Sequence, residues 1–192
     1  MQQQHIHIIV CEGASEYAYI QELNRFLKEN NFPFTFVPSS SDGGKYSQVI
    51  KKYKRIKKDN PRTEILIWID YDIYKRNDNK NGDHYRSKPR GIPDFLFSYF
   101  NFEDFLTLHM KENCLETWQR ICSSNNHFLS PMHAIIYEPL FKKIIGYEKG
   151  TMPFQITEEH LNRLWKNQDD SRILFHCDFA IFLKNLVNET QS

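Results

Sequence analysis

The feature that most constrains the fold is a run of five apolar residues, Ile65-Leu66-Ile67-Trp68-Ile69, which ends abruptly at Asp70-Tyr71-Asp72. A continuous apolar run of this length is typical of a strand that is buried on both faces. His5 to Cys11 has the same character, because it alternates first and then becomes continuously apolar before Glu12-Gly13 interrupts it. Strands of this kind occur mostly in parallel sheets that helices cover on both sides.

The segments between these two runs predict the connections of such a sheet. Residues 15–30 carry an apolar stripe at helical spacing, and residues 34–37 form a short strand. The basic segment 45–58 has apolar residues at helical spacing and ends at Asn60-Pro61. The order β-α-β-α-β therefore predicts an α/β fold with a parallel sheet and right-handed crossovers.

The second half of the chain has a different texture. A long polar stretch over residues 75–91 is followed by segments that are mainly helical. We expect helices at about 101–123, 134–145, 157–167 and 178–188, with a candidate short strand at Ile173–Phe175. A length of 192 residues suits one domain, so we expect a single domain over residues 1–192. Its core would span about 5–91, with a helical elaboration over about 92–192.

Acidic residues follow two of the predicted strands. Glu12 follows the first strand, and Asp70 and Asp72 follow the third. In parallel sheets, ligands bind beyond the carboxyl ends of the strands. The D-x-D spacing in extended chain projects both carboxylates to one side, and Mg²⁺ prefers such oxygen ligands. The pattern thus predicts a Mg²⁺ or Mn²⁺ site suited to phosphoryl transfer, with acids in a solvated turn as the alternative.

The net charge of +1 conceals two basic segments. Residues 45–58 contain seven Lys and Arg and no acid, and residues 75–90 contain six against two acids. Such segments indicate contact with a polyanion such as a nucleic-acid backbone, although a solvated surface gives the same pattern. The candidate contacts are Lys51, Lys52, Lys54, Arg55, Lys75 and Arg76.

The four cysteines include no C-x-x-C pair, so the sequence does not suggest a common zinc site. Their spacing also suggests no disulfide framework, and we expect a reduced, cytoplasmic protein. No apolar run approaches the roughly 18 residues of a membrane span, so we expect no membrane partner.

Four segments together resemble a known family, the RloB-like group of TOPRIM-domain proteins. Ile9–Glu16 is similar to the first TOPRIM motif, a strand followed by E-G-x-x-(D/E), and Ile67–Asp72 is similar to the second, a strand followed by D-x-D. Ser98–His109 resembles the segment S-N-P-C-F-E-x-W-L-L-L-H of the RloB-like group, with Phe100-Asn101 in place of Pro-Cys. Gly146–Gly150 resembles the later G-Y-x-K-G of that group.

The resemblance extends from about residue 6 to residue 186 and implies a TOPRIM-like sheet with a metal-dependent site. In TOPRIM domains, the residues that match Asp70 and Asp72 bind Mg²⁺. The residue that matches Glu12 acts as general acid/base or as a third ligand. Glu103 is then a candidate for binding a second ion or for orienting a ligand. Its alternative role is that of an acid favoured at a helix N-terminus.

Three further residues have weaker indications. Glu16 lies one helical turn after Glu12 and is placed in the second layer of the site. His109 is placed there as well, although its position on a different helix face from Glu103 favours a structural histidine. Lys149, within Gly-Tyr-Glu-Lys-Gly, is a candidate phosphate contact or an incidental residue of a tight turn.

The function that these observations favour is that of a Mg²⁺-dependent nuclease for DNA or RNA. The resemblance implies a link to restriction or phage defence and work beside an ATPase partner. A non-catalytic nucleic-acid-binding or regulatory subunit of such a complex is the alternative. A haloacid-dehalogenase-like phosphatase fits less well, because that family places D-x-D on its first strand and usually follows it with Thr. Here the motif follows the third strand, and Ile73-Tyr74 comes next.

Overall fold

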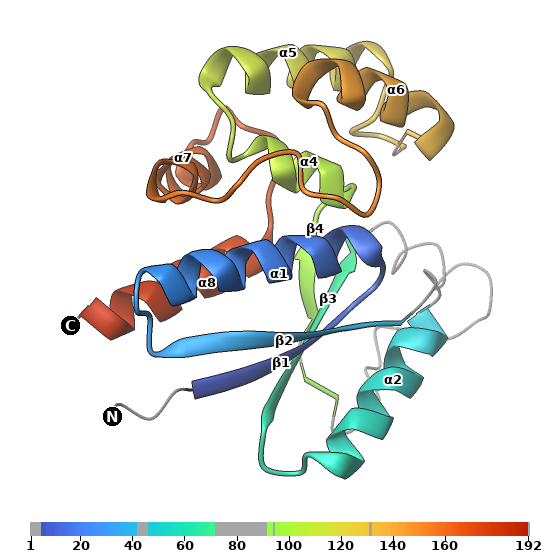
Figure 1. The fold of residues 1–192 in the computed structure, drawn as a ribbon. Helices are drawn as coiled ribbons and strands as arrows, with labels where there is room; N and C mark the ends of the chain where they lie inside the picture. Colours follow the sequence, from blue (N-terminus) through green and yellow to red (C-terminus); the bar gives the residue numbers. More distant parts are fainter. Residues whose placement is uncertain (1–4, 42–45, 72–91, 94, 131, 192) are drawn as a thin grey trace.

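The computed structural model contains a four-stranded sheet in which all strands are parallel, as the sequence predicts (Figure 1). The structure describes residues 5–41, 46–71, 92–93, 95–130 and 132–191. The strand order is β2-β1-β3-β4. The strands are β1 (His5–Cys11), β2 (Phe34–Ser40), β3 (Glu64–Asp70) and β4 (Phe95–Ser98).

Helices cover both faces of the sheet. Successive side chains of a strand point to opposite faces, so the apolar runs of the central strands leave both faces apolar. Ile9 and Trp68 pack with α1 (Ala14–Glu29) and α8 (Asp178–Gln191) on one face. Val10 and Ile67 pack with α2 (Tyr46–Asp59) on the other. The two central strands are therefore buried on both sides, which explains their continuous apolar runs.

A layer of helices lies above α1 in the view of Figure 1. It consists of α4 (Phe102–Thr107), α5 (Glu112–Ser124), α6 (Ala134–Ile145) and α7 (Glu158–Asp169). Buried side chains of this layer, among them Trp118, Phe141 and Leu164, belong to the same hydrophobic cluster as α1 and α8. The helical layer and the sheet therefore share one continuous hydrophobic core.

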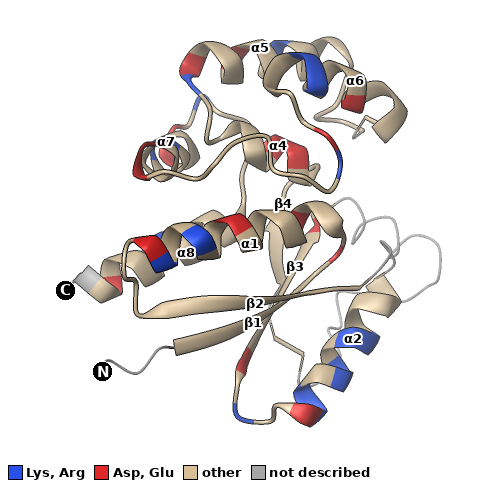
Figure 2. Cartoon of the chain, in the orientation of Figure 1, with Lys and Arg blue, Asp and Glu red and all other residues tan. Residues whose placement is uncertain are grey.

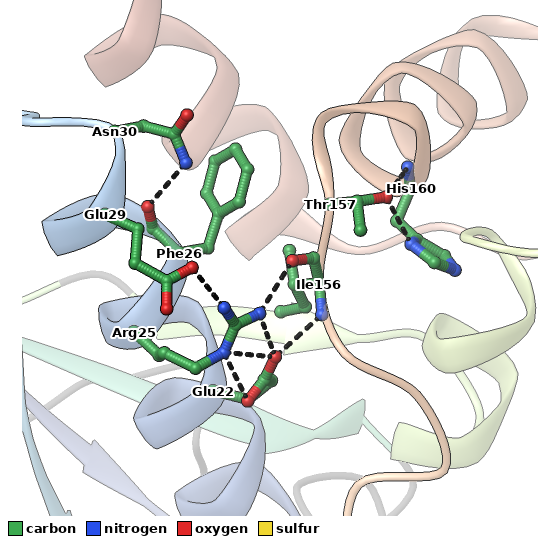
Figure 3. A network of polar contacts seen from close by, with 8 residues as sticks. All are labelled: Glu22, Arg25, Phe26, Glu29, Asn30, Ile156, Thr157 and His160. Atoms are coloured by element: carbon green, nitrogen blue, oxygen red, sulfur yellow. Dashed lines mark hydrogen bonds and ion pairs between the residues drawn. The ribbon is translucent and has the colours of Figure 1, made fainter.

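A polar network fastens the segment before α7 to the outer side of α1 (Figure 3). The Ile156 N–H donates to Glu22 Oε1 at 2.8 Å, and Arg25 Nη2 donates to the Ile156 carbonyl at 2.9 Å. Arg25 is held in place by Glu22 and by Glu29 on its own helix. Thr157 then starts α7, since its hydroxyl accepts the main-chain N–H of His160.

Three details differ from the sequence-based expectation. Phe95–Ser98 is a strand, which pairs with β3, whereas we expected helical texture from Phe95 onward. The expected helix 101–123 is two helices, with a break over residues 108–111. Ile173–Phe175 is not a strand, and only Cys177 makes an isolated bridge to Ser98. β4 and α8 thus belong to the sheet layer although both follow residue 91.

In the part of the chain that the structure describes, none of the helices is both long and apolar enough to span a bilayer.

Trp68 joins three elements, so its truncation should weaken the whole fold. Its ring stacks on Phe179 of α8 at 4.4 Å, and its Nε1 donates to the Ser98 hydroxyl of β4 at 2.9 Å. We expect Trp68→Ala to lower the free energy of unfolding by about 3–5 kcal/mol, measured by urea denaturation. Ile181→Ala on the exposed side of α8 is the control and should change little. Equal effects of the two substitutions would contradict this account.

Candidate metal centre

The parallel pairing of β1 and β3 sets the position of the first two acids. Cys11, the last residue of β1, pairs with Trp68, so Glu12 and Asp70 both follow at the same edge of the sheet. The chain then turns at Gly13, and α1 begins at Ala14. Glu16 lies in the first turn of α1. Figure 2 shows acidic residues where β1 leads into α1.

The structure brings Glu12, Glu16 and Asp70 together. One carboxylate oxygen from each residue lies within 4.8 Å of the other two. Carboxylate oxygens are hard ligands of the kind that Mg²⁺ and Mn²⁺ prefer. Glu16, which we placed in a second layer, is thus a member of the group itself. Asp72 lies outside the described residues.

The electrostatics of this group favour a cation. Burial, followed by the neighbouring charge of Glu12 and a smaller contribution from Glu103, raises the pKa of Glu16 to about 8. Hydrogen bonds from the main chain at Glu16 and Gly13 oppose the shift. A divalent ion would remove the repulsion that causes part of the shift, because it supplies opposite charge at the point where the oxygens converge. The donor set and its charge therefore fit Mg²⁺.

Glu103 lies next to this group but outside it. It is buried in the first turn of α4, and its Oε1 accepts a hydrogen bond from the Tyr147 hydroxyl at 2.7 Å. Burial raises the pKa of Glu103, and the hydrogen bonds from Tyr147 and Tyr137 act in the opposite direction. One oxygen of Glu103 therefore already accepts a hydrogen bond, and the charge of Glu103 contributes to the raised pKa of Glu16.

His109 lies apart from the carboxylates. Its Nε2 is 3.0 Å from the Tyr19 hydroxyl, and the rings of Phe105 and Phe154 surround it. Burial, followed by the charge of His160, lowers the pKa of His109 to about 3. A neutral ring enclosed by aromatic side chains indicates a structural role, which is the role that the sequence favours for this residue.

The predicted basic contacts divide into two groups. Lys51, Lys54 and Arg55 are exposed on α2 and Lys52 is partly exposed, while the apolar side of the helix packs on the sheet (Figure 2). Burial raises the pKa of Cys11 at the end of β1, and the positive charge of Lys52 acts in the opposite direction. Lys52 is therefore close to the end of β1. Lys75 and Arg76 lie outside the described residues.

Lys149 is exposed, and its ammonium group lies near Glu138. Its Nζ lies 3.8 Å from Glu138 Oε1 on α6. It borders a surface hollow of about 480 Å³ between α6 and the segment 146–150. Among the described residues, Lys149 therefore pairs with Glu138 and not with Glu12, Glu16 or Asp70.

Sequence reasoning missed Tyr147 and Ser15. The Tyr147 hydroxyl lies 2.7 Å from Ser15 Oγ and also reaches Glu103, so it connects the first turn of α1 with α4. Tyr147 belongs to the motif Gly-Tyr-Glu-Lys-Gly, in which we selected the lysine as the candidate contact. A contact between residues 132 positions apart leaves no local pattern in the sequence.

A second group of ligand-type residues, Asp104, Cys122 and His127, is fully buried in the helical layer. Asp104 accepts hydrogen bonds from Trp118 Nε1 and from His127 Nε2, both at 2.7 Å, and from the Asn101 N–H at 3.0 Å. His127 Nδ1 accepts the Met132 N–H at 2.8 Å, so the proton of this ring lies on Nε2. Both oxygens of Asp104 are satisfied by donors, which makes this a structural network rather than a metal site.

Removal of the Asp104 carboxylate should therefore destabilise the protein. Asp104→Ala leaves three buried donors without an acceptor, at about 1 kcal/mol or more each. We expect urea denaturation to show a loss of at least about 3 kcal/mol in the free energy of unfolding. Asp169→Ala, which removes an exposed partner of Lys184, is the control and should have a much smaller effect. A stabilisation by Zn²⁺ that wild type shows and Asp104→Ala lacks would contradict the structural role.

The raised pKa of Glu16 predicts a dependence of stability on pH. In the unfolded chain this carboxyl group loses its proton near pH 4.5, whereas in the folded chain it keeps the proton to about pH 8. Within this window unfolding releases a proton, so the free energy of unfolding falls as the pH rises. We expect Glu16→Gln to become progressively more stable than wild type between pH 5 and pH 8 in EDTA, as measured by urea denaturation.

The matched control for this series is Glu148→Gln. The hydrogen bond to Lys142 lowers the pKa of exposed Glu148, so its titration lies below this pH range. Its stability difference from wild type should stay constant from pH 5 to pH 8. A Glu16→Gln difference that is equally flat would refute the electrostatic description of the acidic group.

Comparison with protein families gives a match over most of the chain. A family model described as RloB-like protein matches residues 7–176, from β1 to the segment before α8. Comparison with curated proteins and with solved structures gave no significant match.

Proposed function

The chain belongs to the RloB-like protein family, and on that premise we propose that it is a Mg²⁺-dependent nuclease with a TOPRIM-type site. Its substrates are nucleic-acid phosphodiesters, in DNA or RNA. The proposal includes a role in restriction or phage defence beside an ATPase partner, as the resemblance of the motifs implies. It also includes a cytoplasmic location, which suits four cysteines that are all free thiols.

The observation that carries the proposal is the convergence of Glu12, Glu16 and Asp70 at the carboxyl ends of two parallel strands. This edge of a parallel sheet is where ligands bind in α/β folds. Three carboxylates within 4.8 Å of one another repel when they are ionised, and a cation among them would offset that repulsion. The arrangement therefore supports metal binding independently of any likeness in sequence.

Each residue then has a separate task. Asp70 and Glu12 would hold the ion, with Asp72 as the further ligand that the motif implies, and the ion would neutralise phosphate charge and activate water. Glu12 is also the general acid/base in this proposal, because it extends from a strand end beyond the buried core. Glu16, with its raised pKa, holds a proton near neutral pH until a cation is bound.

The basic side of α2 supports nucleic acid as the substrate. Its lysines and arginine face solvent, and the helix begins at the carboxyl-terminal edge of the sheet because it runs antiparallel to β3. Positive charge beside a site for a divalent cation suits a phosphate backbone that extends past the cleaved bond. Lys75 and Arg76 remain predicted contacts of the same kind.

The test is calorimetric titration with Mn²⁺ and Mg²⁺, because metal binding does not depend on knowing the substrate. We expect wild type to bind and Asp70→Asn to bind at least about tenfold more weakly, since one of few charged ligands is lost. Asp169→Asn, an exposed acid of α7, is the matched control and should bind as wild type does. The titration is repeated with a short oligonucleotide, whose phosphates can complete the coordination shell.

Cleavage assays with DNA and RNA then separate the remaining functions. Metal-dependent cleavage that Glu12→Gln and Asp70→Asn both abolish supports the nuclease. Metal binding without cleavage, also with an ATPase partner present, would favour the regulatory subunit instead. A covalent phosphate trapped on Asp70 would show a phosphatase. Absence of metal binding with and without oligonucleotide would overturn the proposal.

A further inference from the structure

A chain of hydrogen bonds connects the segment Gly146–Gly150 with both α1 and α4. The Gly150 N–H donates to Ser15 Oγ at 3.1 Å, and Ser15 Oγ lies 2.7 Å from the Tyr147 hydroxyl. The Tyr147 hydroxyl in turn donates to Glu103 Oε1 at 2.7 Å. The side chains of Ser15, Tyr147 and Glu103 are all buried.

The direction of this chain follows from the chemistry of its members. The Tyr147 hydroxyl has a single proton, which it donates to Glu103. The Ser15 hydroxyl must then donate to Tyr147, and its oxygen is left to accept the Gly150 N–H. Each hydroxyl is thus used as both donor and acceptor, which fixes its rotation and makes the chain a specific connection.

The backbone of this segment is shaped to make the connection. Gly146 ends α6 at φ 71°, and Gly150 has φ 79°, both in the left-handed region that favours glycine. A β-carbon at Gly150 would also come within 3.3 Å of the Ala14 β-carbon, so the segment lies directly against the start of α1. The Tyr147 ring packs edge-on against Phe141 of α6, which anchors its base.

Two members of this hydrogen-bond chain, Ser15 and Glu103, are linked to the acidic group. Ser15 precedes Glu16, and the turn that contains them follows Glu12 directly. Glu103 lies outside the group of three carboxylates but its charge acts on Glu16. Lys149, the charged residue of the segment, points to Glu138 and takes no part.

We propose that Tyr147 is the positioning residue of the metal centre: its hydroxyl fixes the first turn of α1 relative to Glu103 and so sets the geometry of the three carboxylates. This rests on the proposed metal-binding function. Mg²⁺ demands near-ideal octahedral geometry, whereas Ca²⁺ tolerates irregular ligand positions. A loosened first turn should therefore weaken the binding of Mg²⁺ more than that of Ca²⁺.

The experiment compares Tyr147→Phe with wild type by calorimetric titration with Mg²⁺ and with Ca²⁺, with oligonucleotide present if wild type requires it. The substitution keeps the ring that packs on Phe141 and removes only the hydroxyl. We expect the affinity for Mg²⁺ to fall about 10- to 100-fold, which is the effect of removing a partner that orients a ligand. The affinity for Ca²⁺ should fall by a clearly smaller factor.

Tyr19→Phe is the matched control. It also removes a buried tyrosine hydroxyl, in this case from His109, and it lies on the same helix as Glu16. A merely structural loss lowers both metal affinities by the same factor, so Tyr19→Phe should leave their ratio unchanged. If Tyr147→Phe does not fold, Ser15→Ala, which removes the other hydroxyl of the chain, replaces it with the same expectation.

The outcomes separate this inference from the proposed function. One outcome is that wild type binds Mg²⁺ and Tyr147→Phe, or Ser15→Ala where it replaces that variant, keeps the wild-type ratio of Mg²⁺ to Ca²⁺ affinity. This outcome would overturn the role of Tyr147 but not the proposed metal centre. Failure of wild type to bind Mg²⁺ under either condition would overturn the proposed function, and the positioning role with it.

Discussion

The convergence of the carboxyl groups of Glu12, Glu16 and Asp70 is the constraint on which the rest of the structure depends. Parallel pairing of β1 with β3 puts two carboxylates at one edge of the sheet, and the first turn of α1 adds the third. Neither strand can shift to separate the carboxyl groups, because both strands are central in the sheet and buried on both faces. Burial of the surrounding apolar side chains must offset the cost of holding these acids together, and burial together with the charge of Glu12 accounts for most of the raised pKa of Glu16.

The contrast with Asp104 shows why a set of ligand-type residues does not by itself make a metal site. Asp104, Cys122 and His127 satisfy the same distance criterion and are buried more deeply. Asp104, however, is surrounded by three N–H donors, which stabilise its charge without an ion. Glu16 is surrounded by other acids. The sign of the surrounding charge, and not the proximity of ligands, distinguishes the two groups.

The first half of the fold and the principal acids could be predicted because their causes are local. Continuous apolar runs predict buried strands, and the β-α-β-α-β order requires that Glu12 and Asp70 meet at one edge. β4 could not be predicted in the same way, because four residues become a strand only through pairing with β3. The proximity of Glu16 to Glu12 and Asp70 could not be predicted, because the sequence does not show how the first turn of α1 lies relative to the ends of the strands.

Tyr147 was missed for a different reason, which also explains why a hydroxyl is suited to its position. A lysine there would pair with Glu103 and add positive charge beside the carboxylates, which would weaken the attraction for a cation. A tyrosine hydroxyl fixes the position of Glu103 by donating one hydrogen bond and leaves the negative charge of the site in place. A search for site residues that looks for charge selects Lys149, which faces solvent, and passes over its uncharged neighbour. Residues that orient an acidic centre without neutralising it are found only when the contacts between distant segments are known.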